Sequence, residues 1–158
     1  MEASDKGGPI YNICKNAEKE YSNWLRMLQD PRPAPPIWVN SLEGHTGPVN
    51  AVAVTPEGQV VSGSDDRTIK IWDLATGRLV RSLEGHTDSV NAVAVTPEGQ
   101  VVSGSDDRTI KIWDPYIGKP FDIFGNESHV LCIALSQDHH WFVCGDSEGH
   151  VWIFEWIK

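Results

Sequence analysis

The sequence predicts an all-β fold assembled from repeated four-stranded antiparallel sheets, and three observations point to it. Residues 41–73 align with residues 82–114 at an offset of 41, and 31 of the 33 aligned positions are identical. Each copy holds short segments rich in β-branched residues, separated by turns that contain proline, glycine or aspartate. The first of these segments is almost continuously apolar, so it needs neighbouring repeats stacked on both sides to bury it.

The first copy contains its expected strands in a simple order along the chain. Residues 56–58 (Pro-Glu-Gly) predict a tight turn, because proline fixes φ and glycine readily adopts positive φ. Residues 65–67 (Asp-Asp-Arg) reverse the chain a second time. A fourth segment follows Gly77 and completes a twisted antiparallel sheet. The four strands are expected at residues 49–54, 59–64, 68–72 and 78–83.

A third repeat is degenerate but recognisable. Its strands are expected at residues 130–135, 141–144 and 151–154, and the turn at 137–140 is one residue longer than its counterparts. An atypical last repeat is usual in stacked-repeat proteins, whose terminal units cap the array. Four residues of this repeat stand where the complete copies have His, Ser, Asp and Trp, namely Asn126, Cys144, Glu148 and Phe154.

Two short motifs carry a resemblance to a known family. Each complete copy has Gly-His-Thr near its start, at His45 and His86, and Ile-Lys-Ile-Trp-Asp at its end. This combination in a repeat of about 40 to 45 residues is typical of WD repeats. From about residue 37 to 156 the chain resembles the WD-repeat β-propeller family, which implies four-stranded blades around a central axis. The blades are expected at about residues 42–82, 83–122 and 123–158.

Near-identical blades followed by a worn last blade also resemble the C-terminal propellers of bacterial signalling NTPases of the NACHT or NB-ARC type. This second resemblance implies an alternative, in which the chain is the sensor or regulatory remnant of such a protein. The sequence contains no GxxxxGKS or GxxxxGKT loop, so ATP binding is not carried over. No cofactor is expected.

Residues 1–36 differ in character from the blades. Apolar residues recur there with helical spacing, which predicts a short amphipathic helix over residues 13–29. A proline-rich extended spacer follows at 31–36. Residues 37–42 then align with the fourth strand of the first blade, at 78–83, although no blade precedes them. The last blade, in turn, stops after its third strand.

Three blades are fewer than the four to eight, roughly, that propellers need to close. The lone strand at residues 37–42 and the missing fourth strand of the last blade are complementary. We therefore expect residues 37–42 of one chain to complete the last blade of another, so that two chains close a six-bladed ring. The expected assembly is a homo-oligomer, with the dimer favoured.

Polar residues repeated in both complete blades are the strongest candidates for chemistry. Their types permit a Ser-His-Asp hydrolase, in which a carboxylate orients a histidine that activates a hydroxyl. The family resemblance instead implies a buried hydrogen-bond chain that ties the loop before the first strand to the sheet. Duplication favours this structural role, because every blade needs its own network, and no enzymatic activity is expected. The residues are His45, Ser62, Asp66 and Trp72, then His86, Ser103, Asp107 and Trp113.

Two groups of residues are candidates for binding a protein or peptide partner. The loops after each Gly-His-Thr and the turns between second and third strands should emerge at one end of the blades, a face that binds peptides in the resembling family. Tryptophans near the chain ends are further candidates, since surface tryptophan often marks contact hot spots, although packing against the N-terminal segment is the alternative. The candidates are Pro48, Arg67, Asp88, Ser89, Arg108 and His129 in the loops, with Trp38 and Trp152 at the ends.

Charge and composition argue against several other classes. With 22 acidic and 13 basic residues the net charge is -9, which disfavours nucleic acid and anionic membranes as partners. No apolar run approaches the roughly 20 residues of a membrane span. The N-terminus lacks a basic-then-apolar start, so a cytoplasmic location is expected.

A metal site could be assembled from cysteines and histidines of the last blade. Their spacing matches no compact zinc pattern, and strands would scatter them over two faces. No metal is therefore expected. The residues considered are Cys132, His139, His140, Cys144 and His150.

Overall fold

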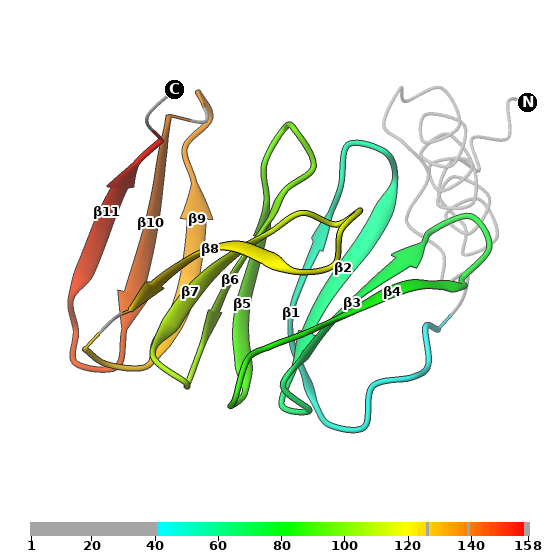
Figure 1. Cartoon of the computed structure of the whole chain (residues 1–158), viewed down its shortest axis with the longest axis horizontal. Coiled ribbons are helices and arrows are strands. Elements are labelled where there is room, and N and C mark those ends of the chain that lie inside the picture. Colours follow the sequence, from blue (N-terminus) through cyan, green and yellow to red (C-terminus); the bar gives the residue numbers. More distant parts are fainter. Residues whose placement is uncertain (1–40, 126, 139, 157–158) are drawn as a thin grey trace, which may run out of the picture. The chain divides into compact units, whose positions relative to one another are not determined.

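The computed structural model describes residues 41–125, 127–138 and 140–156. The helix expected at 13–29, the proline-rich spacer and residues 37–40 of the strand expected at 37–42, Trp38 among them, lie outside these residues. Ser41 and Leu42, the described part of that expected strand, are not in a strand. Within the described residues the chain is all-β, and no helix there has the length and apolar character that a membrane crossing requires. The strands (Figure 1) are β1 (Val49–Val54), β2 (Gln59–Ser64), β3 (Thr68–Asp73), β4 (Leu79–Glu84), β5 (Val90–Val95), β6 (Val101–Ser105), β7 (Thr109–Trp113), β8 (Pro120–Gly125), β9 (Val130–Leu135), β10 (Trp141–Asp146) and β11 (Val151–Glu155).

These strands form three antiparallel sheets, each the meander that the sequence predicts. Blade 1 has the order β1-β2-β3-β4 and blade 2 the order β5-β6-β7-β8. Blade 3 contains only β9, β10 and β11, so among the described residues no strand pairs with the far edge of β11. The expectation of four-stranded blades with an incomplete last blade is confirmed, and strand ends differ from it by one or two residues.

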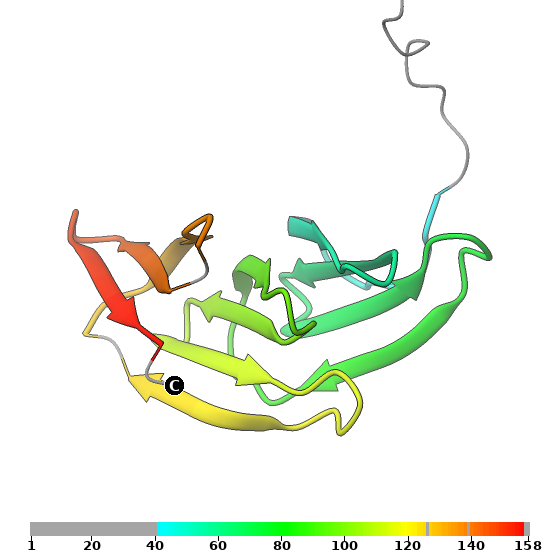
Figure 2. The same cartoon turned by 90° about the horizontal axis from the view of Figure 1, so that it is seen from above.

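Two hydrophobic cores lie between neighbouring blades, which stack in chain order (Figure 2). The first core joins blade 1 to blade 2 and includes Val61, Ile71 and Val90, each at most 1% exposed. The second joins blade 2 to blade 3 around Val130 and Phe142. Strands β1, β5 and β9 lie next to one another across these contacts. Blade 2 is therefore covered on both faces.

Glycine in the middle of the second strand allows the blades to approach closely. A Cβ atom added to Gly63 would lie 2.7 Å from Cγ1 of Val90 in the next blade, too close for real atoms. Gly104 has the same relation to Val130, and a Cβ atom there would overlap the valine side chain. Glycine in a strand often marks such a close approach.

Candidate functional site

The repeated polar residues of blades 1 and 2 lie together in two nearly identical networks. In blade 2, Nδ1 of His86 lies 2.7 Å from Oδ2 of Asp107, and Nε2 lies 2.8 Å from Oγ of Ser103. The indole nitrogen of Trp113 donates to the same Oγ atom at 2.8 Å. In blade 1 the same contacts join His45, Asp66, Ser62 and Trp72 at 2.8, 2.7 and 2.8 Å.

Every hydrogen bond of the network joins a donor to an acceptor when the histidine is neutral with its proton on Nδ1. That N–H group donates to the aspartate carboxylate, and Nε2 accepts the serine hydroxyl proton. The serine oxygen in turn accepts the indole N–H group. A buried network in which every group has a partner rigidifies its surroundings.

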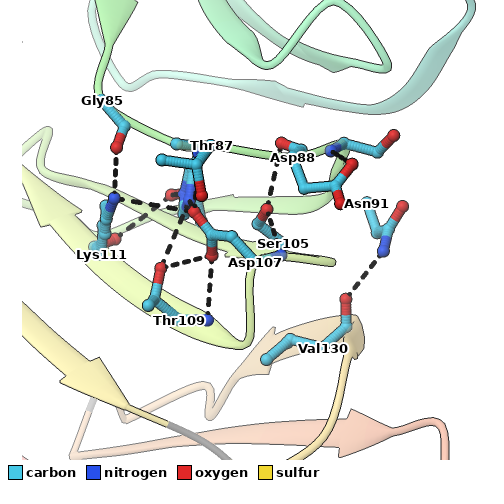
Figure 3. Close-up of polar contacts among 12 residues, drawn as sticks. Gly85, Thr87, Asp88, Asn91, Ser105, Asp107, Thr109, Lys111 and Val130 are labelled. Carbon is cyan, nitrogen blue, oxygen red and sulfur yellow. Dashed lines mark hydrogen bonds and ion pairs between the residues drawn. The ribbon is translucent and has the colours of Figure 1, made fainter.

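In blade 2 the aspartate of the network also ties two loops together (Figure 3). Oδ1 of Asp107 accepts hydrogen bonds from the backbone N–H and the hydroxyl of Thr109, at 3.0 and 2.6 Å. Its Oδ2 atom accepts the backbone N–H of Thr87 at 3.0 Å. Arg108, which lies between Asp107 and Thr109 in the turn, has a φ of 65°. The carboxylate thus links the β6–β7 turn to the loop that precedes β5.

Burial and these hydrogen bonds set the charge of the network in blade 2. Burial lowers the pKa of His86, although its hydrogen bond to Asp107 opposes this shift. Burial by itself would raise the pKa of Asp107, but hydrogen bonds from Thr109, Thr87 and His86 outweigh it and lower that pKa to about 2. In blade 1, hydrogen bonds chiefly from Thr68 likewise overcome burial and lower the pKa of Asp66 below its usual range. The aspartates are therefore ionised at neutral pH.

The order Asp-His-Ser matches that of a hydrolase triad, but access and hydrogen bonding differ. A catalytic serine needs an oxygen that a substrate can reach. Ser103 is fully buried and Ser62 is 5% exposed. Each serine oxygen also accepts an indole N–H group, which occupies a lone pair of the atom that would have to attack a substrate. This arrangement suits a link between loop and sheet better than attack on a substrate.

Blade 3 contains a different network, which sequence reasoning missed. Its centre is Asp146, whose Oδ2 accepts the indole N–H of Trp152 at 2.9 Å and lies 3.1 Å from Nδ1 of His150. Its Oδ1 accepts the backbone N–H groups of Glu148 and His150. Burial alone would raise the pKa of Asp146, but hydrogen bonds from Trp152, Ser128 and His150 lower it below its usual range.

A sequence signal for this second network existed. Asp146 stands where the complete blades have Ser64 and Ser105, and Trp152 stands where they have Lys70 and Lys111. Blade 3 thus has both an acceptor and an indole donor at positions where the complete blades have serine and lysine. Trp152, expected at a partner surface, is 38% exposed with its N–H group engaged inside the blade. Glu148, aligned with the aspartates, contributes only its backbone N–H group to Asp146.

The loop residues expected to bind a partner lie at one end of the blades. Equivalent backbone hydrogen bonds join the two loops there: Asp65 N–H to Pro48 O at 3.0 Å, Asp106 N–H to Ser89 O at 2.9 Å and Ser147 N–H to His129 O at 3.0 Å. We call this end the loop face. Its candidates Pro48, Arg67, Asp88, Arg108 and His129 are exposed and Ser89 is half-buried.

The described residues considered for a metal site differ in burial and in their contacts. Cys144 is buried and Cys132 is exposed. His140 lies 2.9 Å from Glu155 through Nε2, and His150 contacts Asp146. His139 is outside the described residues. In the part of the chain that the structure describes, no three His, Cys, Asp or Glu residues gather as metal ligands.

Comparison with known proteins gives one family. The family model "WD domain, G-beta repeat" matches residues 37–73, 77–114 and 118–155. The second and third matches begin two residues before β4 and β8, respectively. The first begins at residue 37, which aligns with residue 78, one residue before β4.

Curated relatives and a crystal structure resemble parts of the chain. Over 70 residues it is 46% identical to the "Ribosome biogenesis protein BOP1 homolog" of Drosophila ananassae and 47% identical to that of Drosophila grimshawi. These matches cover 42% of the chain but only 9% of each relative. The crystal structure of the WD40 beta propeller domain of Doa1 superposes with a TM-score of 0.66 at 30% identity. That match covers 72% of this chain and 38% of the Doa1 chain.

Proposed function

The chain belongs to the WD-repeat family, and on this premise we propose that it is a non-catalytic protein-interaction scaffold whose ring closes when two copies associate. The observation that carries the proposal is the exposure of both end blades. Val52 of blade 1 is 66% exposed, whereas its equivalent in blade 2, Val93, is 8% exposed. Ile153 of blade 3 is 67% exposed, whereas its equivalent Ile112 is 1% exposed.

Exposed apolar faces of this kind favour association. Side chains that are core residues in the middle blade face solvent in the two end blades, where no further described blade covers them. Large exposed apolar patches mark interaction surfaces or aggregation hazards. No described strand pairs with the far edge of β11, and such an edge of backbone N–H and C=O groups can template a further strand. A second copy would cover both kinds of surface.

The scaffold role rests on the loop face. Its exposed side chains come from equivalent loops of successive blades, so a closed ring would present them side by side around its centre. The blades carry the negative charge of the chain, which favours partners with basic segments. The role named for the BOP1 homologs is not carried over, because the matched segment is 9% of those proteins. A cytoplasmic location remains a prediction from the sequence.

Light scattering coupled to size exclusion tests ring closure. We expect a particle of twice the 17.5 kDa chain mass that melts in one cooperative transition. A compact single chain with the same melting behaviour at all concentrations would contradict closure.

A separate experiment tests the scaffold role. A library of basic peptides is screened for binding, and the affinity of each hit is measured by fluorescence anisotropy. We expect Asp88→Asn, on the loop face, to weaken binding. The control is Glu98→Gln, an exposed residue of the β5–β6 turn that changes the charge equally. Equal effects of both variants, or no hits, would reject the loop face as a peptide site.

A further inference from the structure

Resting on the proposed two-chain ring, we propose a specific junction between the copies. Val49 of one copy packs onto Gly145 of the other, and Leu42 of the first copy lies opposite Val151 of the second. The junction thereby repeats the contact that joins blade 1 to blade 2 and blade 2 to blade 3.

The existing contacts show the first part of the repeated pattern. Val90 packs on Gly63 and Val130 packs on Gly104, and both valines are fully buried. The next glycine in the series is Gly145, where a built Cβ atom would meet Sγ of Cys132 in the same blade but no described residue of another blade within 4 Å. The valine without a glycine is Val49, which is 50% exposed. One open glycine and one open valine remain, at opposite ends of the three blades.

The surroundings of Gly145 are apolar and face solvent. Cys132 pairs with Gly145 and is exposed, in the place that Ala51 and Ala92 occupy beside Gly63 and Gly104. Leu131, which follows Val130, is 49% exposed. In blades 1 and 2 the residue at this position, directly after the equivalent valine, is an asparagine. Those asparagines, Asn50 and Asn91, donate across the contact to the carbonyl oxygens of Val90 and Val130 at 3.2 and 3.0 Å. At the proposed junction an apolar contact takes the place of that hydrogen bond.

The second part of the pattern fixes the register on β11. In blade 2, Ile110 pairs with Phe124, Ile112 with Asp122 and Trp113 with Pro120, and blade 1 has the equivalent pairs. By the sequence repeat, Leu42 of the first copy aligns with Leu83, which pairs with Ile69, so Leu42 is expected opposite Val151 of the second copy. Val151 is 71% exposed, whereas its equivalents Ile69 and Ile110 are buried.

A second copy of this chain fits better than another occupant because it supplies both pieces at the required spacing. In the complete blades, β4 leads through the Gly-His-Thr loop directly into β5, which carries Val90. Residues 37–42 lead through the same loop sequence into β1, which carries Val49. Strand β1 of the same chain belongs to blade 1, at the other end of the stack from β11 (Figure 1).

Cross-linking tests which residues meet. The chain carries Cys14→Ser and Val49→Cys, and keeps the exposed Cys132 and the buried Cys144. A short bis-maleimide should then join residue 49 of one copy to Cys132 of another, giving a covalent dimer whose linked peptides are identified by mass spectrometry. The matched control is Ile117→Cys in the same background, an exposed position in the β7–β8 turn of the middle blade, which should not link to Cys132.

Mass measurement separates this junction from the broader proposal. Val52→Asp should shift the particle from twice 17.5 kDa to a single chain, whereas Ile117→Asp, at 67% exposure, should leave the dimer intact. A wild-type dimer that forms no 49–132 link and resists Val52→Asp would overturn this junction while leaving ring closure standing. A wild type that is always a single chain would overturn both.

Discussion

The indole nitrogen of Trp152 donates to Oδ2 of Asp146, and this pair repeats the geometry of Trp113 and Ser103. In blade 3 both residues are shifted by two positions along their strands. Trp113 pairs across the strands with Val101, two residues before its acceptor Ser103. Trp152 pairs with Cys144, again two residues before its acceptor. Because side chains alternate with a period of two, this shift moves donor and acceptor together and keeps them on one face. Blade 3 therefore retains a tryptophan link between its strands.

The first prediction is that Trp152→Phe destabilises blade 3. Phenylalanine keeps most of the ring but cannot donate to Asp146, whose carboxylate would lose one of its partners. We expect a lower midpoint of urea unfolding, followed by tryptophan fluorescence.

A matched control is Trp141→Phe, in the neighbouring strand β10 at a similar exposure, 39% against 38%. The structure gives the Trp141 indole no side-chain link of the same kind to Asp146, so its replacement should change the midpoint much less. Equal effects of the two substitutions would contradict the role assigned to the Trp152–Asp146 hydrogen bond.

The strands and the polar networks of the complete blades could be read from the sequence because local chemistry and repetition agree there. Turn residues such as Gly58 have a φ of 79°, as the proline–glycine turn requires. His86 and Asp107 are 21 residues apart, yet they meet because the loop and the turn emerge at one end of the same sheet.

Blade 3 was harder to read because alignment assigns roles by position. Alignment puts Glu148 in the place of the aspartate, whereas the carboxylate that accepts the hydrogen bonds is Asp146, in a serine position. When donor and acceptor both stand two positions away, the alignment shows only that Cys144 and Phe154 replace the serine and the tryptophan of the complete blades. Only the three-dimensional register shows that the two changes compensate each other.

The second prediction concerns the close approach of blades 2 and 3. Gly104→Ala would place a Cβ atom inside the volume of the Val130 side chain and against Ile133. Overpacking of this kind costs about 1–3 kcal/mol. We expect a loss of that size in the free energy of unfolding, measured with urea. Gly125→Ala is the control, since nothing lies within 4 Å of its added Cβ atom, and a comparable loss there would contradict the packing argument.

The third prediction is that Ser103 and Trp113 act as a coupled structural pair. Ser103→Ala leaves the indole N–H of Trp113 and the Nε2 atom of His86 without their buried partner, at a cost of about 1–3 kcal/mol. Trp113→Phe alone should also lower the free energy of unfolding. The loss measured for the double variant should be smaller than the sum of the losses of the two single variants. Strict additivity in this double-mutant cycle would show that the hydrogen bond contributes nothing.

An esterase assay on the same variants addresses the hydrolase alternative. The buried Ser103 should give the wild type no more activity towards a nitrophenyl ester than Ser103→Ala. Turnover that disappears in Ser103→Ala while the protein stays folded would support a catalytic role and oppose the proposed scaffold.

The fourth prediction is that acid destabilises the protein in two stages. Burial holds the pKa of His86 below its ordinary value of 6.5, so the unfolded chain binds a proton that the folded chain does not. By linkage, the stability from neutral His86 is complete above pH 6.5 and declines as the pH falls towards the folded pKa. Asp107 has a pKa of about 2 when folded against 3.8 ordinarily, so its contribution is lost between those values.

Urea unfolding at a series of pH values from 7.5 to about 3 measures this dependence as the slope of stability against pH. His86→Gln should be less stable than the wild type at pH 7.5 and should show a shallower decline just below pH 6.5, because glutamine does not titrate. The decline attributed to Asp107 should persist in that variant, since Thr109 and Thr87 still donate to its carboxylate. A wild-type stability that rises from pH 6.5 to 5 would have the wrong sign for a histidine held neutral by burial.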